Sequence, residues 1–254
     1  MDIELVQLLR NNKCQVKYNQ KYDHTWTNCE IIEHIIDLDC SNNNLTNLPY
    51  LPNCQVLNCN DNQLTNLPYL PKCETINCKN NKIKFMSAIP ECQELLCSSN
   101  ELIILPSLLK CKILACNCNH LFSLSELPEC EFLDCACNKL KQLPNLPKCT
   151  HLHCMNNQLI KLPDNLSQCK TIDCRNNQLL EIPNNLNNCD NLRCIDNLII
   201  NDDKIEKKQY KISYQSNGKS FVIKEPFGYI KEMNMFSSSL KLDFKKLGKE
   251  YEKY

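Results

Sequence analysis

Residues 111–121 read "CKILACNCNHL", and residues 130–140, 19 positions further on, read "CEFLDCACNKL". The same pattern of two cysteines, a leucine or isoleucine and an asparagine recurs from residue 35 to residue 200, in steps of 19 or 20 residues. A period of this size is typical of proteins whose repeats stack into a solenoid, each contacting only its neighbours. The pattern therefore predicts one continuous repeat array.

Cysteine occupies two fixed positions of the repeat. The first series comprises Cys40, Cys59, Cys78, Cys97, Cys116, Cys135, Cys154, Cys174 and Cys194, and the second comprises Cys54, Cys73, Cys92, Cys111, Cys130, Cys149, Cys169 and Cys189. Stacked repeats would hold these side chains parallel, about 4.8 Å apart, whereas disulfides need converging Cβ vectors. We therefore expect free thiols that act as small buried hydrophobic groups. Such a core favours a reducing, cytoplasmic location.

The unit resembles the leucine-rich repeat L-x-x-L-x-L-x-x-N-x-L, with cysteine in the first and third leucine positions. Outer segments such as "TNLPYLP" and "KQLPNLP" resemble the short repeats of bacterial effectors, and the Asn-, Lys- and Ile-rich composition is similar to that of leucine-rich-repeat proteins of giant DNA viruses. The resemblance covers nine units, residues 35–200. It implies an α/β repeat fold, a right-handed solenoid with a parallel concave sheet, and for a viral protein the host cytoplasm.

The resemblance also implies that one asparagine of each unit belongs to a ladder that satisfies the backbone groups of the turns. These residues are Asn43, Asn62, Asn81, Asn100, Asn119, Asn138, Asn157, Asn177 and Asn197. Because strand side chains alternate between two faces, the leucine or isoleucine between the two cysteines is expected to form a second buried ladder.

A solenoid exposes its core at both ends and needs caps. Residues 1–34, which begin with a short amphipathic helix and contain Trp26, are the expected N-terminal cap. Residues 201–254 are the expected C-terminal α+β cap, with a hairpin about Asn217-Gly218 and a helix. That helix would place four apolar side chains on one face: Leu240, Phe244, Leu247 and Tyr251.

Charge and hydropathy exclude several classes of partner. Lys+Arg and Asp+Glu are balanced at 29 each, so no overall field favours nucleic acid or an anionic membrane. We find no secretory signal and no apolar run that could span a bilayer. Bacterial effectors with these repeats often carry a ubiquitin-ligase domain with a catalytic cysteine, but here no cysteine follows Cys194. We therefore expect no enzyme, catalytic residue or cofactor.

The concave face has a distinctive order of side chains. The first units supply polar residues, and the last units supply Asp173, Arg175 and Arg193. The middle units supply a patch that is apolar although strand positions facing solvent are usually polar: Leu96, Ile113, Ala115, Phe132, Ala136 and Met155. An apolar centre with a charged rim is typical of a protein-binding surface. We predict a partner-binding site there, which also includes Asp134, His151 and His153.

Two alternatives concern other residues. Cys118 and Cys137 occupy a polar position just after the strand in adjacent units, where they could pair, bind a metal with His120, or simply replace polar residues. The row Asp134, His153 and Asp173 could bind a metal or act as acid and base, or be a solvated row of the binding face.

Three functions follow from these patterns. The favoured one is a non-catalytic scaffold that binds a partner protein near repeats 4–7. A metal- or redox-responsive protein is the second, and a structural rod that associates with itself is the third. Whether Cys14 pairs with Cys29 is left open by the sequence.

Overall fold

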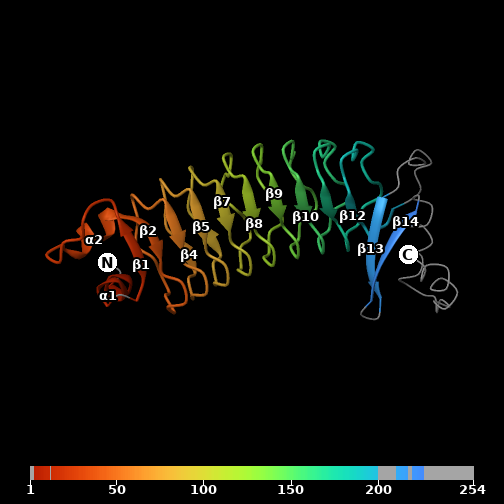
Figure 1. Ribbon diagram of the computed structural model, residues 1–254. Coiled ribbons are helices and arrows are strands. Elements are labelled where there is room, and N and C mark those ends of the chain that lie inside the picture. The colour runs from red at the N-terminus through yellow and green to blue at the C-terminus, as the bar shows by residue number, and fades with distance from the viewer. Residues whose placement is uncertain (1–2, 12, 200–209, 217–218, 226–254) are drawn as a thin grey trace.

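The computed structural model describes residues 3–11, 13–199, 210–216 and 219–225. Within them the chain winds into an elongated solenoid with one sheet along its length (Figure 1). The sheet has ten strands, and their spatial order follows the sequence. They are β1 (Gln15–Tyr18), β2 (Ile35–Asp39), β3 (Val56–Asn58), β5 (Thr75–Asn77), β7 (Glu94–Leu96), β8 (Ile113–Ala115), β9 (Phe132–Asp134), β10 (His151–His153), β11 (Thr171–Asp173) and β12 (Asn191–Arg193).

The strands from β2 to β12 are parallel and pair residue for residue with the equivalent position of the next repeat. Leu114 of β8, for example, lies opposite Leu133 of β9, which lies opposite Leu152 of β10. We number the coils 1 to 9 by these strands, so that β7, β8, β9 and β10 belong to coils 4 to 7. The predicted parallel-sheet solenoid of short leucine-rich repeats is thus confirmed.

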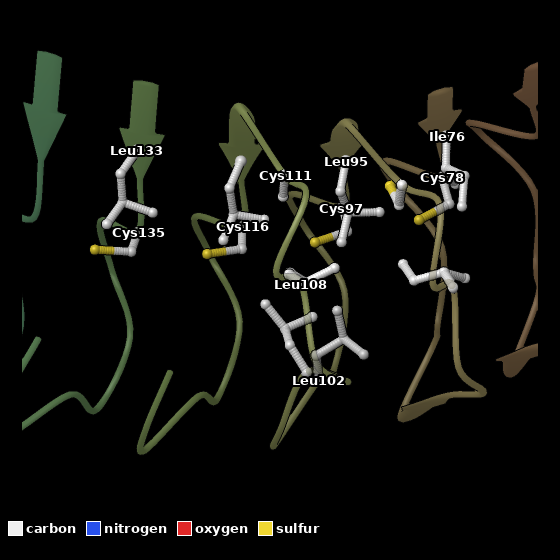
Figure 2. Packing of buried hydrophobic residues seen from close by; sticks show 14 of the residues in the cluster. Ile76, Cys78, Leu95, Cys97, Leu102, Leu108, Cys111, Cys116, Leu133 and Cys135 are labelled. Atoms are coloured by element: carbon white, nitrogen blue, oxygen red, sulfur yellow. The ribbon is translucent and has the colours of Figure 1, made fainter. Parts of the chain in front are cut away.

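The two cysteine series and the leucine ladder form the core. Every first-series cysteine has an exposed fraction of 0%, and so do Leu95, Leu114 and Leu133. Figure 2 shows the first-series sulfurs of four successive coils in one row beside the leucine ladder. All are free thiols. The second series is buried except Cys189, which is half-buried; it begins the last repeat, so no thiol of a following repeat packs against it.

The asparagine ladder ties each coil to the one before it. Asn119 is 5% exposed, and its Nδ2 donates to the carbonyls of Cys97 at 3.0 Å and Cys116 at 3.1 Å. Its Oδ1 accepts the backbone N–H of Leu102 at 3.0 Å. Because these backbone groups face the dry core, the amide satisfies an N–H that would otherwise be unpaired, and it shares the two carbonyls with the amides of Asn100 and Asn138.

The turn after each strand uses left-handed backbone without glycine. The equivalent residue of every coil has φ between 52° and 60°, and Asn44 of coil 1 has a φ of 58° as well. The nine equivalent residues are Asn42, Asp61, Asn80, Ser99, Cys118, Cys137, Asn156, Asn176 and Asp196. Asparagine and aspartate tolerate this region better than other non-glycine residues. The array therefore turns repeatedly although all three glycines lie after residue 217.

Replacing Ser99 tests this account of the turn. Ser99 is exposed and has a φ of 57°. Ser99→Val is expected to lower the free energy of unfolding by about 1–2 kcal/mol, because a β-branched residue clashes in left-handed backbone. Ser99→Gly is expected to leave it unchanged or raise it by up to ~1 kcal/mol. Urea unfolding of both variants measures the difference, and equal losses would contradict a conformational origin.

The two ends of the sheet differ from the repeats. At the N-terminal end, α1 (Ile3–Arg10), α2 (Asn28–His34) and β1 precede the first coil, and β1 pairs antiparallel with β2. Helix α2 begins with a capping box between Thr27 and Glu30, and α1 confirms the expected N-terminal helix. The assignment of residues 1–34 and 201–254 as caps stays a prediction.

Four more strands lie outside the long sheet. On the outer side of the solenoid, β4 (Asn66–Leu67) pairs with β6 (Phe85–Met86). Beyond β12, β13 (Tyr210–Ser216) and β14 (Lys219–Glu225) form the predicted hairpin (Figure 1). The helix expected from Leu240, Phe244, Leu247 and Tyr251 lies outside the described residues. Neither helix of the described part is long and apolar enough to cross a membrane.

Candidate functional site

The parallel register gathers the predicted concave residues into two rows. Ile113, Phe132 and His151 pair directly across β8, β9 and β10. A second row, two positions further along each strand, runs from Leu96 through Ala115, Asp134 and His153 to Asp173. Side chains at these positions share one face of the sheet, because they lie an even number of residues apart. Residues distant in sequence therefore form one surface.

This surface is narrower than the sequence predicts. Ile113 is 38% exposed, and Leu96, Phe132 and Met155 are half-buried. Ala115 and Ala136, at 8% and 6%, are buried and contribute little area of their own. On a concave sheet a methyl side chain is covered by its larger neighbours. The pattern of residue types along the sequence does not show how far each side chain extends from the sheet. We call Leu96, Ile113, Phe132 and Met155 the apolar strip.

Phe132 lies at the centre of an aromatic group. Its ring centroid is 5.6 Å from that of His153 in an edge-on arrangement and 6.3 Å from that of His151. His151 is exposed, and its Nδ1 lies 2.9 Å from the hydroxyl of Thr150. The two imidazoles on β10 thus border the phenylalanine on β9.

The C-terminal part of the face carries an ion-pair group. Arg175 donates from Nε and Nη2 to the two carboxylate oxygens of Asp173, at 2.8 and 2.7 Å. Arg193 Nη1 lies 3.8 Å from the same carboxylate. The hydrogen bond to Asp173 raises the pKa of Arg175. Asp173 is buried at 7% exposure, so the two arginines, rather than the aspartate, present charge to the solvent.

The row Asp134, His153 and Asp173 exists, but its carboxylates have structural partners. Asp134 Oδ1 accepts the backbone N–H of Ala136 at 3.1 Å, and Asp173 is held by Arg175. These contacts hold the turns that follow β9 and β11. Among the residues that the structure describes, no group of three His, Cys, Asp or Glu side chains is arranged to hold a metal ion.

Cys118, Cys137 and His120 follow the strands of coils 5 and 6. Cys118 is exposed and Cys137 half-buried, as expected for their polar position, and His120 is exposed. In the N-terminal segment, Cys29 is exposed and Cys14 half-buried, and both are free. Burial raises the pKa of the Cys14 thiol to about 11.

A set of apolar residues on the outer surface was not predicted from the sequence. They lie one or two residues after the last leucine of the repeat motif in coils 3 to 5. The equivalent position is polar in coils 2 and 6, with Thr65 and Lys141, and apolar again in coils 7 and 8, with Ile160 and Leu180. The exposed fractions of the residues in coils 3 to 5 range from 42% to 60%: Phe85, Ile103, Ile104 and Phe122. This outer row is more exposed than the apolar strip. Apolar residues at a position that is polar in some other coils could have indicated this exposed row from the sequence.

No protein-family model matches the chain, and no curated protein matches it in sequence. Among solved structures, it is similar to YopM, a leucine-rich effector protein from Yersinia pestis, with a TM-score of 0.59 and 34% identity over 65% of this chain and 50% of that one. YopM from Yersinia enterocolitica gives 0.62 and 30%, over 65% of this chain and 38% of that one.

A Shigella effector leucine-rich-repeat domain gives a TM-score of 0.52 and 26% identity over 68% of this chain and 74% of that domain. The chain spans half or less of the length of the two YopM structures. The repeat period, the parallel sheet and the similarity to these structures all indicate the same kind of solenoid. The chain has the fold and the repeat pattern of leucine-rich-repeat proteins with short, 19–20-residue units.

Proposed function

We propose that the protein is a non-catalytic scaffold that binds a partner protein on the concave face over β7 to β10. The observation that carries the proposal is the apolar strip, whose residues lie on β7, β8 and β9 and just after β10. Solvated residues are usual on such a face. The similar solved proteins include bacterial effectors with leucine-rich repeats, which supports an interaction role as a class.

The arrangement of charge describes the partner further. Phe132 and Ile113 offer aromatic and aliphatic contact area at the centre, which is where interface hot spots concentrate. At one end of the face, Arg175 and Arg193 both contact the buried carboxylate of Asp173. Two positive charges thus face one negative charge, and this end has a net positive charge. The complementary partner surface therefore has an apolar side chain flanked, on the side of β12, by a carboxylate.

The thiol core supports placing this scaffold in a reducing compartment. Seventeen of the 21 cysteines belong to the two series, and folding them under oxidising conditions would produce mispaired disulfides. A cytoplasm, that of the host if the protein is viral, meets this requirement.

Replacing Phe132 by Asp tests the site. A carboxylate at the centre of an apolar interface would be desolvated without a partner, so we expect binding to weaken at least ~30-fold, the effect of losing an anchor of about 2 kcal/mol. A photo-crosslinking residue at position 151 first captures the partner in cells, and mass spectrometry identifies it. Calorimetry with the purified partner then compares the variant with the wild type.

Ile160→Asp is the matched control, since Ile160 is 50% exposed and lies outside the sheet. It should bind as the wild type does. Binding lost in Ile160→Asp and kept in Phe132→Asp would move the interface to the outer surface. A wild-type dimer in sedimentation that Phe132→Asp dissociates would instead identify the partner as a second copy.

A further inference from the structure

Cys118 and Cys137 lie outside both cysteine series and are not used by the proposed binding face. They occupy the same left-handed position in coils 5 and 6, with φ of 56° and 55°. Side chains at this position touch between adjacent coils elsewhere: Asn80 Nδ2 donates to Asp61 Oδ1 at 2.8 Å. Asn156 of coil 7 reaches Cys137 in the same way, with Nδ2 3.3 Å from Sγ. Two thiols at this position of neighbouring coils are therefore in contact range.

The backbone holds the two cysteines at a spacing that suits a disulfide. The backbone N–H of Cys118 donates to the carbonyl of Ala136 at 2.9 Å, and the backbone N–H of Asn119 donates to the carbonyl of Cys137 at 3.3 Å. Strand-like spacing puts equivalent Cα atoms about 4.8 Å apart, within the roughly 4.4–6.8 Å that disulfides span. The cysteines of the two series have the same spacing, but core packing holds their side chains parallel. Cys118 is exposed and Cys137 half-buried, so their side chains can rotate and the sulfurs can converge without displacing core residues.

Accessibility separates this pair from the two series. Cys116 and Cys135 lie two residues earlier in the same coils and are fully buried. Burial raises the pKa of both far above the ordinary thiol value, so they do not form thiolates at neutral pH. Cys118 is exposed, and its pKa is raised less, by partial burial opposed by the Asn117 amide and reinforced by Cys137.

We propose that Cys118 and Cys137 form a surface dithiol that small-molecule disulfides convert into one bond bridging coils 5 and 6. The Cys118 thiolate attacks a sulfur of the small disulfide and releases one small thiol. The Cys137 thiolate then attacks the Cys118 sulfur of the mixed disulfide and releases the second. The protein loses two protons and two electrons, and the small disulfide is reduced to two thiols. The bridge borders the edge of the concave face next to Ala136.

A redox titration with glutathione disulfide and glutathione tests the proposal on the native full-length chain. Accessible thiols are blocked under native conditions, and peptide mapping locates each modification. We expect one internal bond, seen as a loss of two hydrogens, in a linked pair of peptides that contain Cys118 and Cys137. The reducing agent dithiothreitol should reverse it, and the bridged form should melt at a higher temperature, because the bond restricts the unfolded chain.

Cys118→Ser and Cys137→Ser should each abolish the bond and leave the remaining cysteine with a glutathione adduct. Cys29→Ser is the matched control, since Cys29 is exposed but has no equivalent in an adjacent coil; it should keep the bond. The proposal is overturned if wild-type Cys118 and Cys137 each carry glutathione without bridging. It is also overturned if both stay reduced while Cys29 is modified.

Discussion

The reduced protein is expected to unfold cooperatively between about pH 9 and pH 10, although it is stable at pH 7, because its core consists of thiols. Burial raises the pKa of every first-series cysteine, to about 12 for Cys78 and Cys194 and well above the ordinary value for Cys97 and Cys116. A thiol is neutral when protonated, so the fold favours the protonated form. The unfolded chain releases its thiol protons from about pH 8.5.

The direction and size of the effect follow from this difference. Below about pH 8.5 both states keep their thiol protons and stability does not depend on them. Above it, the unfolded state loses protons that the folded state retains, and each buried thiol then costs about 1.4 kcal/mol per pH unit. The nine first-series thiols together cost about 12 kcal/mol per pH unit, comparable with the whole stability of a typical domain.

Circular dichroism during a pH titration with reductant present follows unfolding, and near-ultraviolet thiolate absorbance counts the thiols that ionise. The two signals should change together. Cys116→Ala removes one buried thiol, so its free energy of unfolding should fall less steeply with pH, by about 1.4 kcal/mol per pH unit. A reduced protein that keeps its fold at pH 11 would show that the cysteine ladders do not control its alkaline stability.

The second large effect is expected from Asn119→Ala, which should lower the free energy of unfolding by about 3–5 kcal/mol. The substitution leaves the buried N–H of Leu102 without a partner. It also removes one of two hydrogen bonds to each of the carbonyls of Cys97 and Cys116, which keep those from Asn100 and Asn138, and each lost bond adds about 0.5–1.5 kcal/mol. An unsatisfied buried backbone group costs about 1–3 kcal/mol. Urea unfolding at neutral pH with reductant measures the loss.

His120→Ala is the control for this substitution. His120 is the next residue, is exposed, and its removal should change stability by no more than ~0.5 kcal/mol. If Asn119→Ala costs as little as His120→Ala, water replaces the amide, and the ladder is not what joins the coils. The equivalent Asn138 and Asn100 make the same set of bonds, so their substitutions should have effects of similar size.

Much of the fold could be predicted from the sequence because each repeat contacts only its neighbours. The spacing of Cys97, Cys116 and Cys135 indicates the period of the repeat. The resemblance to leucine-rich repeats implies a strand in each repeat, its buried face and the parallel register. The position of Cys118 and Cys137 was likewise predictable as a polar position after the strand. Its left-handed conformation was not predicted, since the polar residues found there do not by themselves distinguish it from an ordinary turn.

The candidate site was predicted only in outline. Alternation along the strands correctly assigns Ile113, Phe132 and His151 to one face. Alternation does not show how far a side chain extends from the sheet. The burial of Ala115 and Ala136 was therefore found only in the structure. The pattern also did not indicate that Asp173 is enclosed by Arg175 and Arg193, because that contact depends on side-chain conformations across two coils.

The sequence by itself determined the solenoid, its period, its thiol core and its asparagine ladder. These depend on local alternation and on a repeat that returns equivalent residues to equivalent places. Only the tertiary structure decided which concave side chains reach the solvent, which charges are already paired, and that residues at the position of Cys118 and Cys137 touch between coils. Exposure and contact are properties of neighbouring coils together, since each depends on the size and conformation of side chains 19 or 20 residues away.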